Sequence, residues 1–476
     1  MRKTKIVCTI GPSSESPEML SKLIAAGMNV ARLNFAHGEP EEHAQRIRNV
    51  REAAAAQNAY VAVLIDTKGP EIRIGKLQES YVELVPGELV TLTTEEILGT
   101  KDRIHVTYKQ LPQDVKPGSI ILVDDGLVRL EVQHAEGTEI TCLIRNGGRL
   151  KPRKGVNVPG VKTSLPGVTE KDIRHIKFGV EQKIDIIAQS FVRKAEDILE
   201  IKHILDELGA GHIQVVAKIE NDEGVENLDA ILSVADGLMV ARGDLGVDLP
   251  VEDVPLVQKE MIRKCNLAGK PVITATHMLE SMQQNPRPTR AEAGDVANAV
   301  FDGTDAVMLS GESAAGKYPL ESVETMARIA VKAESALDSY SWLTLQAARK
   351  APDVTGAIGQ AVAQTALELG AKAILALTES GFTARMIAKH KPQAPVIAVS
   401  SSSDVLHALT LTWGVVPLLR KETASGTDEI VAAAIELARA GGHVQDGDLV
   451  VITAGVPAGA TGTTNLLRVQ QVGDLL

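Results

Sequence analysis

The stretch VVAKIENDEG, from Val215 to Gly224, ends an apolar run with a lysine and a glutamate two residues apart. Alternate side chains of a strand point to the same side, so Lys218 and Glu220 are predicted to lie next to each other. Opposite charges at the edge of a core are costly unless something at that edge compensates them. The pair therefore indicates either a structural ion pair or a functional site.

Short runs rich in valine and isoleucine alternate with longer helical patterns on both sides of this stretch. Three strand–helix units precede a region of short strands punctuated by glycine and proline, and five units follow it. Nearly continuous apolar strands are typical of parallel sheets that are buried on both faces. Eight units predict an α/β fold, a (β/α)8 TIM barrel with an all-β lid domain inserted after strand three.

Helix–strand alternation returns in the last part of the chain, after a lapse near residues 339–356, and predicts a C-terminal open α/β domain. The lid divides the barrel sequence into two parts. The predicted boundaries are 1–69 and 169–338 for the barrel, 70–168 for the lid and 355–476 for the C-terminal domain.

Composition limits the classes of protein that fit. The chain has 476 residues, a net charge of -11 and three cysteines, which are Cys8, Cys142 and Cys265. The acidic charge argues against general nucleic-acid binding, and no run of about 18 apolar residues is present to span a membrane. The N-terminal sequence reads as a first strand rather than a signal peptide. The widely spaced cysteines match no metal site or disulfide framework, which favours a cytoplasmic location.

Polar residues gather where the predicted strands end, and a barrel of this kind carries its active site at the carboxyl ends of its strands. Six strand ends are polar: Arg32, Asn34 and His37; Asp66, Thr67 and Lys68; Lys218, Glu220 and Asn221; Arg242, Gly243 and Asp244; Thr274, Thr276 and His277; Ser310 and Glu312. Six such ends together favour a functional site over a structural ion pair.

Two of these carboxylates, Glu220 and Asp244, follow neighbouring strands and could share a divalent cation. Mg2+ takes one or two protein carboxylates and completes its octahedron with water and substrate oxygens. A lysine beside this pair, with arginines at other strand ends around the mouth of the barrel, suits a phosphorylated anion. The pattern therefore favours phosphoryl transfer. The sequence contains no Walker A motif, so a bound nucleotide would use other contacts.

Eight stretches of the chain resemble the pyruvate kinase family: KIVCTIGP, GMNVARLNFAHG, DTKGPEIR, KGVNVPG, AKIEN, GLMVARGDLG, NPRPTRAE and DAVMLSGE. The resemblance is to bacterial members without the extra C-terminal extension that some of them carry. It implies a barrel with a mobile lid and a regulatory C-terminal domain. It also implies transfer of the phosphoryl group of phosphoenolpyruvate to ADP, giving pyruvate and ATP, as the last step of glycolysis in a cytoplasmic homotetramer.

The resemblance implies roles for individual residues. The Mg2+ ligands would be Glu220 and Asp244, and Mn2+ could substitute for Mg2+. Substrate contacts would come from Arg32, Lys218, Gly243, Asp244 and Thr276. Catalytic roles fall on Lys218, which would neutralise the transferring phosphoryl group, and on the proposed proton relay of Thr276, Ser310 and Glu312. Nucleotide contacts would come from Asn34, His37, Arg73 and Lys154, the last of these from the lid.

A K+ site is also implied, with Asn34, Asp66 and Thr67 as ligands. Ala36 stands where the family usually has a serine ligand, whereas Glu71 matches the glutamate typical of K+-dependent members. These two signals disagree. Because a water molecule can replace a lost hydroxyl, we expect K+ dependence with weaker K+ binding.

Two features leave alternatives open. His277 stands where the family usually has glutamine, and is either a neutral hydrogen-bonding ring or a group that titrates beside the proton path. The stretch TESGFT follows a predicted strand, and is either an ordinary turn with capping residues or a loop that holds the phosphate of a sugar-phosphate or nucleotide-monophosphate effector. Its binding residues would be Thr378, Ser380, Gly381 and Thr383.

Two other classes of protein share part of this pattern. An aldolase of the citrate-lyase type would also use an acidic metal pair, but it would need neither the lid nor the NPRPTRAE segment. A non-catalytic metabolite sensor would be expected to lose Lys218, Glu220 or Asp244, and all three are present. An active pyruvate kinase is therefore the favoured interpretation.

Overall fold

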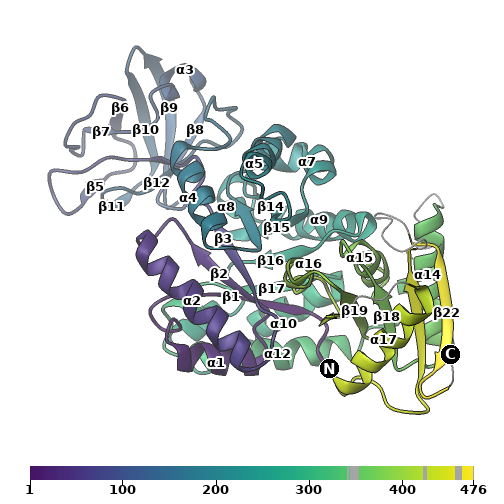
Figure 1. Cartoon of the computed structure of the whole chain (residues 1–476). Helices are drawn as coiled ribbons and strands as arrows, with labels where there is room; N and C mark the ends of the chain where they lie inside the picture. Colours follow the sequence, from purple (N-terminus) through teal and green to yellow (C-terminus); the bar gives the residue numbers. More distant parts are fainter. Residues whose placement is uncertain (340–341, 344–352, 422–425, 456–463, 475–476) are drawn as a thin grey trace.

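Three bodies make up the chain in the computed structural model, with the lid at one end, the barrel in the middle and the C-terminal domain at the other end (Figure 1). The described residues are 1–339, 342–343, 353–421, 426–455 and 464–474. The predicted lapse between barrel and C-terminal domain falls largely outside them. Within this described part, no helix is both long and apolar enough to cross a bilayer.

Eight parallel strands close into a barrel in the order β1-β17-β16-β15-β14-β13-β3-β2, which confirms the predicted fold. Small and branched side chains such as Val7, Ala62 and Val216 fill its interior. The strands are β1 (Lys5–Thr9), β2 (Val30–Asn34), β3 (Ala62–Asp66), β13 (Ile186–Gln189), β14 (Gln214–Ile219), β15 (Gly237–Ala241), β16 (Val272–Ala275) and β17 (Ala306–Leu309).

Helices surround the barrel, and the longer ones bury an apolar stripe against the outer faces of the strands. They are α1 (Pro17–Ala26), α2 (Pro40–Ala56), α4 (Glu170–Glu181), α5 (Ala195–Glu207), α6 (Asp222–Glu226), α7 (Leu228–Val234), α8 (Arg242–Asp248), α9 (Val254–Ala268), the 3-10 helix η1 (Glu280–Gln283), α10 (Arg290–Asp302), α11 (Gly311–Ala314) and α12 (Pro319–Glu334). Helix α4 begins at a capping box, in which Thr169 and Asp172 each bond the other's backbone amide.

The lid is a separate layer with its own apolar core. It holds a seven-stranded sheet in the order β4-β12-β8-β9-β10-β6-β7 and the pair β11-β5. One short helix interrupts the predicted all-β pattern. The elements are β4 (Ile72–Arg73), β5 (Val82–Leu84), β6 (Leu89–Thr93), β7 (Arg103–His105), α3 (Leu111–Asp114), β8 (Ile120–Val123), β9 (Val128–Glu136), β10 (Glu139–Asn146), β11 (Gly148–Leu150) and β12 (Gly155–Asn157).

The C-terminal domain is an open sheet in the order β20-β19-β18-β21-β22, with helices between its strands. The last strand, β22, runs antiparallel to β21, while the other pairs are parallel. The elements are α14 (Val354–Glu368), β18 (Ala373–Leu377), α15 (Phe382–Ala388), β19 (Val396–Ser400), α16 (Ser403–Leu409), β20 (Val415–Leu419), α17 (Thr427–Ala440), β21 (Leu449–Ala454) and β22 (Leu466–Gln471).

Buried polar contacts join the amino end of the barrel to this domain. Asp305 Oδ1 accepts hydrogen bonds from Lys391 Nζ at 3.1 Å and from the Trp413 amide at 3.2 Å. Lys5, in β1, donates from Nζ to the Val415 carbonyl at 2.6 Å. Burial lowers the pKa of Lys5 to about 7, and the nearby Arg2 adds to this effect.

The free energy of unfolding is therefore expected to rise with pH above about 7 because of Lys5. Below that value Lys5 is charged in both states, and its burial cost is fully present. Between about 7 and 10.5 the unfolded chain holds the proton that the folded chain has released, so folding gains at most about 1.4 kcal/mol per pH unit from this group. Melting curves of the wild type and Lys5→Met, recorded from pH 6.5 to 9.5, measure this gain as a difference.

The control for that measurement is Lys22→Met, since the Lys22 side chain is half exposed on α1. Relative to Lys5→Met, the wild type should gain stability as pH rises, while Lys22→Met should follow the wild type. Parallel curves for the wild type and Lys5→Met would contradict a lowered pKa at Lys5.

Candidate active site

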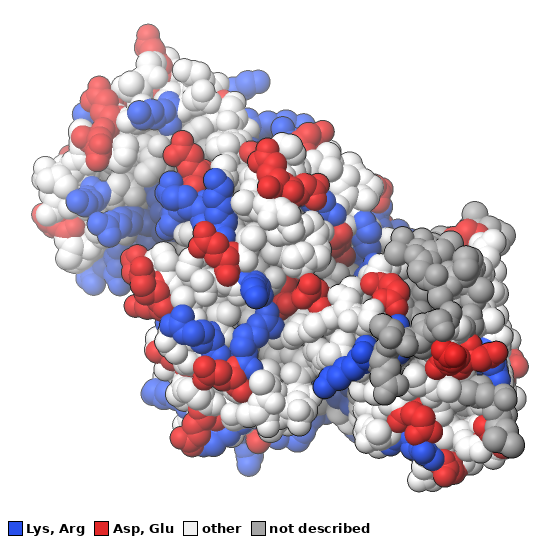
Figure 2. Space-filling model, in the orientation of Figure 1, with Lys and Arg blue, Asp and Glu red and all other residues white. Residues whose placement is uncertain are grey.

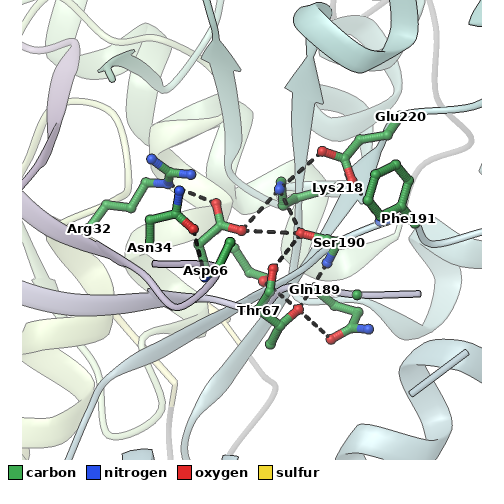
Figure 3. A network of polar contacts seen from close by, with 12 residues as sticks. Arg32, Asn34, Asp66, Thr67, Gln189, Ser190, Phe191, Lys218 and Glu220 are labelled. Atoms are coloured by element: carbon green, nitrogen blue, oxygen red, sulfur yellow. Dashed lines mark hydrogen bonds and ion pairs between the residues drawn. The ribbon is translucent and has the colours of Figure 1, made fainter. Parts of the chain in front are cut away.

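A row of alternating charges lies at the carboxyl edge of the barrel (Figure 3). Arg32 Nε donates to Asp66 Oδ2 at 2.7 Å, and Lys218 Nζ lies 2.9 Å from Asp66 Oδ1 and 3.0 Å from Glu220 Oε1. The row therefore runs Arg32, Asp66, Lys218, Glu220, across strands β2, β3 and β14. The predicted adjacency of Lys218 and Glu220 is confirmed, and the barrel brings Asp66 and Arg32 to them.

Burial makes this row electrostatically demanding, since all four residues are at most 8% exposed. Burial alone would raise the pKa of Asp66, but Arg32 and Lys218 together outweigh it and hold that pKa below its ordinary value. Burial would likewise lower the pKa of Lys218, but Asp66 and Glu220 outweigh it, so the pKa is raised. Lys218 is thus held as an ammonium ion and Asp66 as a carboxylate.

Glu220 and Asp244 form the acidic end of the site. Burial raises the pKa of Glu220, Lys218 opposes this rise, and the nearby Asp244 adds to it. Burial also raises the pKa of Asp244, again against the effect of Lys218. Two buried carboxylates whose charged forms are disfavoured fit a divalent cation, because the cation compensates both charges. Among the described residues, no group of three or more histidine, cysteine, aspartate or glutamate side chains is placed to hold a metal ion. Mg2+ needs only one or two protein carboxylates.

Ser190 is a site residue that the sequence interpretation missed. Its hydroxyl accepts a hydrogen bond from Lys218 Nζ at 2.7 Å and lies 2.7 Å from the Thr67 carbonyl, to which it donates. The next amide, of Phe191, donates to Glu220 Oε2 at 2.6 Å. The fourth strand, β13, ends at Gln189 and Ser190 follows it directly, so the polar strand-end pattern used for the other strands would have found Ser190.

Thr67, which follows β3, is hydrogen-bonded to the end of β13. Its hydroxyl donates to Gln189 Oε1 at 2.8 Å and accepts from the Ser190 amide at 3.1 Å. The backbone carbonyl of Thr67 is bonded to the Ser190 hydroxyl. Of the three predicted K+ ligands, Asp66 and Thr67 therefore already take part in the polar network of Figure 3.

The third predicted K+ ligand, Asn34, is the last residue of β2. Its Oδ1 accepts a hydrogen bond from the Ala36 amide at 3.0 Å, and Asn34 is the register partner of Asp66. His37 is exposed, and its carbonyl lies 2.8 Å from Nε2 of the buried His43. Oxygen atoms of Asn34, Asp66 and Thr67 are thus at the ends of the adjacent strands β2 and β3, and oxygen is the ligand type that a hard cation requires.

Gly243 and Thr276 touch at the ends of β15 and β16. A Cβ atom on Gly243 would lie 2.9 Å from Thr276 Cγ2, so only glycine fits there without a shift. Thr276 and His277 both have positive φ, at 71° and 56°, and the His277 side chain is exposed. The guanidinium of Arg242 donates to the Thr276 carbonyl at 2.6 Å and so supports this unusual backbone.

Ser310 and Glu312 lie at the end of β17. Glu312 is fully buried, and its carboxylate accepts hydrogen bonds from the amides of Leu279 at 3.1 Å and of Ser310 at 2.7 Å. Burial raises the pKa of Glu312, and these amides oppose the rise. Glu312 therefore ties the loop that follows Thr276 to the loop that starts at Ser310.

The lid adds a second group of charges. Arg73, Lys154 and Asp244 line one cavity between the lid and the barrel, and Figure 2 shows lysine and arginine side chains gathered where the two meet. Lys154 Nζ pairs with Asp124 at 2.7 Å, and Arg73 Nε pairs with Glu71 at 2.7 Å. Arg32, Asn34 and His37 do not line this cavity.

The predicted effector loop lies far from this edge, in the C-terminal domain after β18. Thr378 and Thr383 are buried, and the Thr383 hydroxyl bonds that of Thr464. Ser380 is exposed, and its carbonyl accepts a hydrogen bond from Arg385 Nη1 at 3.3 Å. The hydroxyl that is open to solvent in this loop is therefore that of Ser380.

A closed barrel, a lid over its carboxyl edge and a buried row of charges at that edge define a lidded (β/α)8-barrel enzyme. The model of the pyruvate kinase barrel domain matches residues 1–323, and that of the pyruvate kinase alpha/beta domain matches residues 356–470. The chain belongs to the pyruvate kinase family.

Relatives named pyruvate kinase match the chain over its whole length. Those of Geobacillus stearothermophilus and Bacillus licheniformis are 57% and 56% identical, covering 100% of this chain and 81% of each relative. A crystal structure of a pyruvate kinase from Cryptosporidium parvum superposes with a TM-score of 0.94 at 40% identity, covering 99% of this chain and 96% of that one.

Proposed function

We propose that the protein transfers the phosphoryl group of phosphoenolpyruvate to ADP, giving pyruvate and ATP. The observation that carries this proposal is the buried row of Arg32, Asp66, Lys218 and Glu220 at the carboxyl edge of the barrel. Two fixed cations next to an acidic pair suit an anionic substrate that arrives with a divalent cation. The relatives' name, pyruvate kinase, supports the same reaction.

Each group has a proposed task. Arg32 and Lys218 bind and orient the phosphoryl group, and Lys218 balances the charge that develops during transfer because it stays protonated. Glu220 and Asp244 would hold Mg2+, or Mn2+ in its place, which supplies further charge neutralisation when bound. The absence of a side chain at Gly243 leaves room beside Thr276. The Thr276 hydroxyl is assigned to the substrate.

Proton delivery to the carbon of the enolate is assigned to the Thr276, Ser310 and Glu312 group. Glu312 acts there by holding the backbone of Ser310 and of the loop after Thr276. Arg73 and Lys154, at the cavity between lid and barrel, together with Asn34 and His37, are assigned to the nucleotide. Closure of the lid would exclude water and strengthen these charge contacts.

The first experiment measures ATP formation from phosphoenolpyruvate and ADP with Mg2+, with and without K+ at matched ionic strength. Robust turnover that needs Mg2+ is expected. No turnover from folded protein would contradict the proposed function and favour a metabolite sensor. Equal turnover with and without K+ would leave the reaction standing but would contradict a K+ site at Asn34, Asp66 and Thr67.

Restoring a hydroxyl at position 36 is expected to tighten K+ binding. The loop after β2 brings Ala36 next to Asn34, whose Oδ1 bonds the Ala36 amide. A hydroxyl ligand is worth about 1–1.5 kcal/mol, so Ala36→Ser should lower the half-saturating K+ concentration about tenfold. Activation curves for K+ measure this, with Ala36→Val as the control that adds bulk without a ligand. An unchanged K+ requirement in Ala36→Ser would place the K+ site elsewhere.

Several further assignments belong to the same proposal. The domain boundaries are proposed at 69, 168, 338 and 355, the assembly is a homotetramer, and the setting is cytoplasmic, as the last step of glycolysis. The loop of Thr378, Ser380, Gly381 and Thr383 is proposed to bind the phosphate of a sugar-phosphate or nucleotide-monophosphate effector. Of these four residues, Ser380 is the exposed one, so its hydroxyl is the accessible group.

A further inference from the structure

The lid returns to the barrel through a segment, residues 158–169, that contains no helix or strand between β12 and α4. Side-chain contacts hold this return segment in place. On the lid side, the Ser164 amide donates to the Tyr108 hydroxyl at 2.8 Å, and that hydroxyl donates to Asp114 at 2.5 Å. The lid is therefore hydrogen-bonded to the return segment at Ser164.

The barrel bonds the same segment at three places: Asp222 at the Gly160 amide, Gln189 at the Gly167 carbonyl, and Arg193 on both sides of Ser164. Arg193 Nη1 donates to the Thr163 carbonyl at 3.0 Å and lies 3.2 Å from the Thr163 hydroxyl, and its Nη2 donates to the Leu165 carbonyl at 2.5 Å. Backbone groups on either side of Ser164 are thus bonded to the barrel, while Ser164 itself is bonded to the lid. Residues 163–165 lie where the two bodies meet and form the pivot of the return segment.

Arg193 is itself held rigidly. The Arg193 amide donates to Asp197 Oδ2 at 2.9 Å, and its guanidinium lies 4.0 Å from the same oxygen. The Arg193 carbonyl accepts a hydrogen bond from Asn227 Nδ2 at 2.9 Å. A Cβ atom on Gly167 would lie 2.2 Å from Asp197 Oδ1, so the return segment packs directly against this anchor. The side chain of Arg193 is only 11% exposed.

The loop that carries Arg193 also supports the charged row. Ser190 accepts the hydrogen bond from Lys218, and the Phe191 amide donates to Glu220, as Figure 3 shows. Phe191 has a φ of 55°, a conformation that is uncommon for a bulky non-glycine residue. Residues 190–193 therefore contact Lys218 and Glu220 at one end and the pivot of the lid at the other.

We propose that Arg193 is a positioning residue that couples the orientation of the lid to the placement of Lys218 and Glu220. A change in lid angle moves the carbonyls of Thr163 and Leu165, and the planar guanidinium transmits this displacement to the loop at Phe191 because it binds both carbonyls in a fixed fork. The inference rests on the proposed function, since its consequence for catalysis is measured in that reaction.

The test compares Arg193→Met and Arg193→Lys with Arg51→Met. Arg51 is a matched control at the amino end of the barrel, where it donates to the carbonyls of Val61 at 3.1 Å and Lys183 at 2.9 Å and pairs with Asp185 at 2.7 Å. It therefore makes a similar set of contacts, but with no part of the lid. Thermal stability, kcat, and KM for each substrate are measured for all variants.

Lid orientation is measured separately with a pair of spin labels. Leu89→Cys in the lid and Leu199→Cys on α5 provide exposed positions, at 58% and 47%, while the native cysteines are all buried and should resist labelling. The label-to-label distance distribution is recorded by double electron–electron resonance in the labelled wild type and in each labelled variant. This readout does not depend on activity.

Arg193→Met is expected to broaden the distance distribution, raise KM for ADP about tenfold and lower kcat. Arg193→Lys should give an intermediate result because one ammonium cannot bridge both carbonyls. Arg51→Met should lose melting temperature without any of these changes. If Arg193→Met does not fold, the same measurements on Arg193→Lys decide the question.

The proposal is overturned if folded Arg193 variants lose only melting temperature, as Arg51→Met does, and keep the wild-type distance distribution and KM values. It is also overturned if the lid distribution broadens while kcat and KM stay unchanged, because the coupling would then be missing. An inactive wild type would contradict the proposed function instead, and the spin-label distances would still report whether Arg193 holds the lid.

Discussion

Lys218→Met is expected to lower kcat by about three orders of magnitude. Lys218 is the one residue of the charged row that contacts both carboxylates, Asp66 and Glu220, and its raised pKa keeps it cationic. Loss of a preorganised charged donor in a buried site costs about 10^2–10^3 in kcat, and the larger figure applies because the transferring group is itself an anion. Steady-state kinetics with both substrates saturating measures the change.

The same variant should also be less stable, because it leaves two buried carboxylates without their shared cation. Breaking a buried ion pair costs about 3–5 kcal/mol, part of which proton uptake by the carboxylates relieves. Lys259→Met, at a lysine that is more than half exposed and pairs with Asp302, is the control and should keep both activity and melting temperature. A Lys218→Met enzyme that keeps activity within tenfold of wild type would remove Lys218 from the catalytic step.

Glu220→Gln and Asp244→Asn are each expected to lower turnover more than 100-fold and to raise the Mg2+ concentration needed for half-maximal rate. Substitution of residues that only orient metal ligands typically lowers metal affinity or activity 10–100-fold. The effect of losing a charged ligand should exceed that range. Glutamine keeps the shape of Glu220 and can still accept the Phe191 amide, so the change removes charge rather than packing.

Binding of Mn2+, followed by electron paramagnetic resonance without substrates, tests the metal site independently of turnover. Both variants should bind Mn2+ more weakly than the wild type. Glu226→Gln is the matched control, since Glu226 is exposed at the end of α6, six residues after Glu220. Wild-type Mn2+ affinity in both variants would show that the acidic pair holds no metal, even if turnover were lost.

Parts of the site that depend on one strand were predictable from the sequence. Lys218 and Glu220 are neighbours because strand geometry places alternate side chains on one side, and their 3.0 Å contact follows from that periodicity. Polar strand ends also marked Asp66, Asp244 and Glu312, because parallel barrel strands present their carboxyl ends at one edge. The same rule applied to β13 would have found Ser190.

Other parts could not be predicted, because they depend on residues that the chain brings together from a distance. Lys218 and Asp66 are 152 positions apart, and Arg193 and Leu165 belong to different bodies of the molecule. Which side chains come into contact depends on the stagger of the strands in the closed barrel and on the angle of the lid. Neither property produces a local pattern in the sequence. Arg193 has no feature in the sequence that separates it from an ordinary surface arginine.

The order of the elements, the barrel with its inserted lid, the family and the polar strand ends could all be predicted from the amino-acid sequence. These properties follow from local periodicity and from motifs that are contiguous in the chain. The folded structure was needed to show that Asp66 lies between Arg32 and Lys218, and that one four-residue loop contacts both the charged row and the pivot of the lid. The reason is physical: barrel closure and lid packing set the distances between strands and loops, whereas periodicity sets only the direction in which a side chain points.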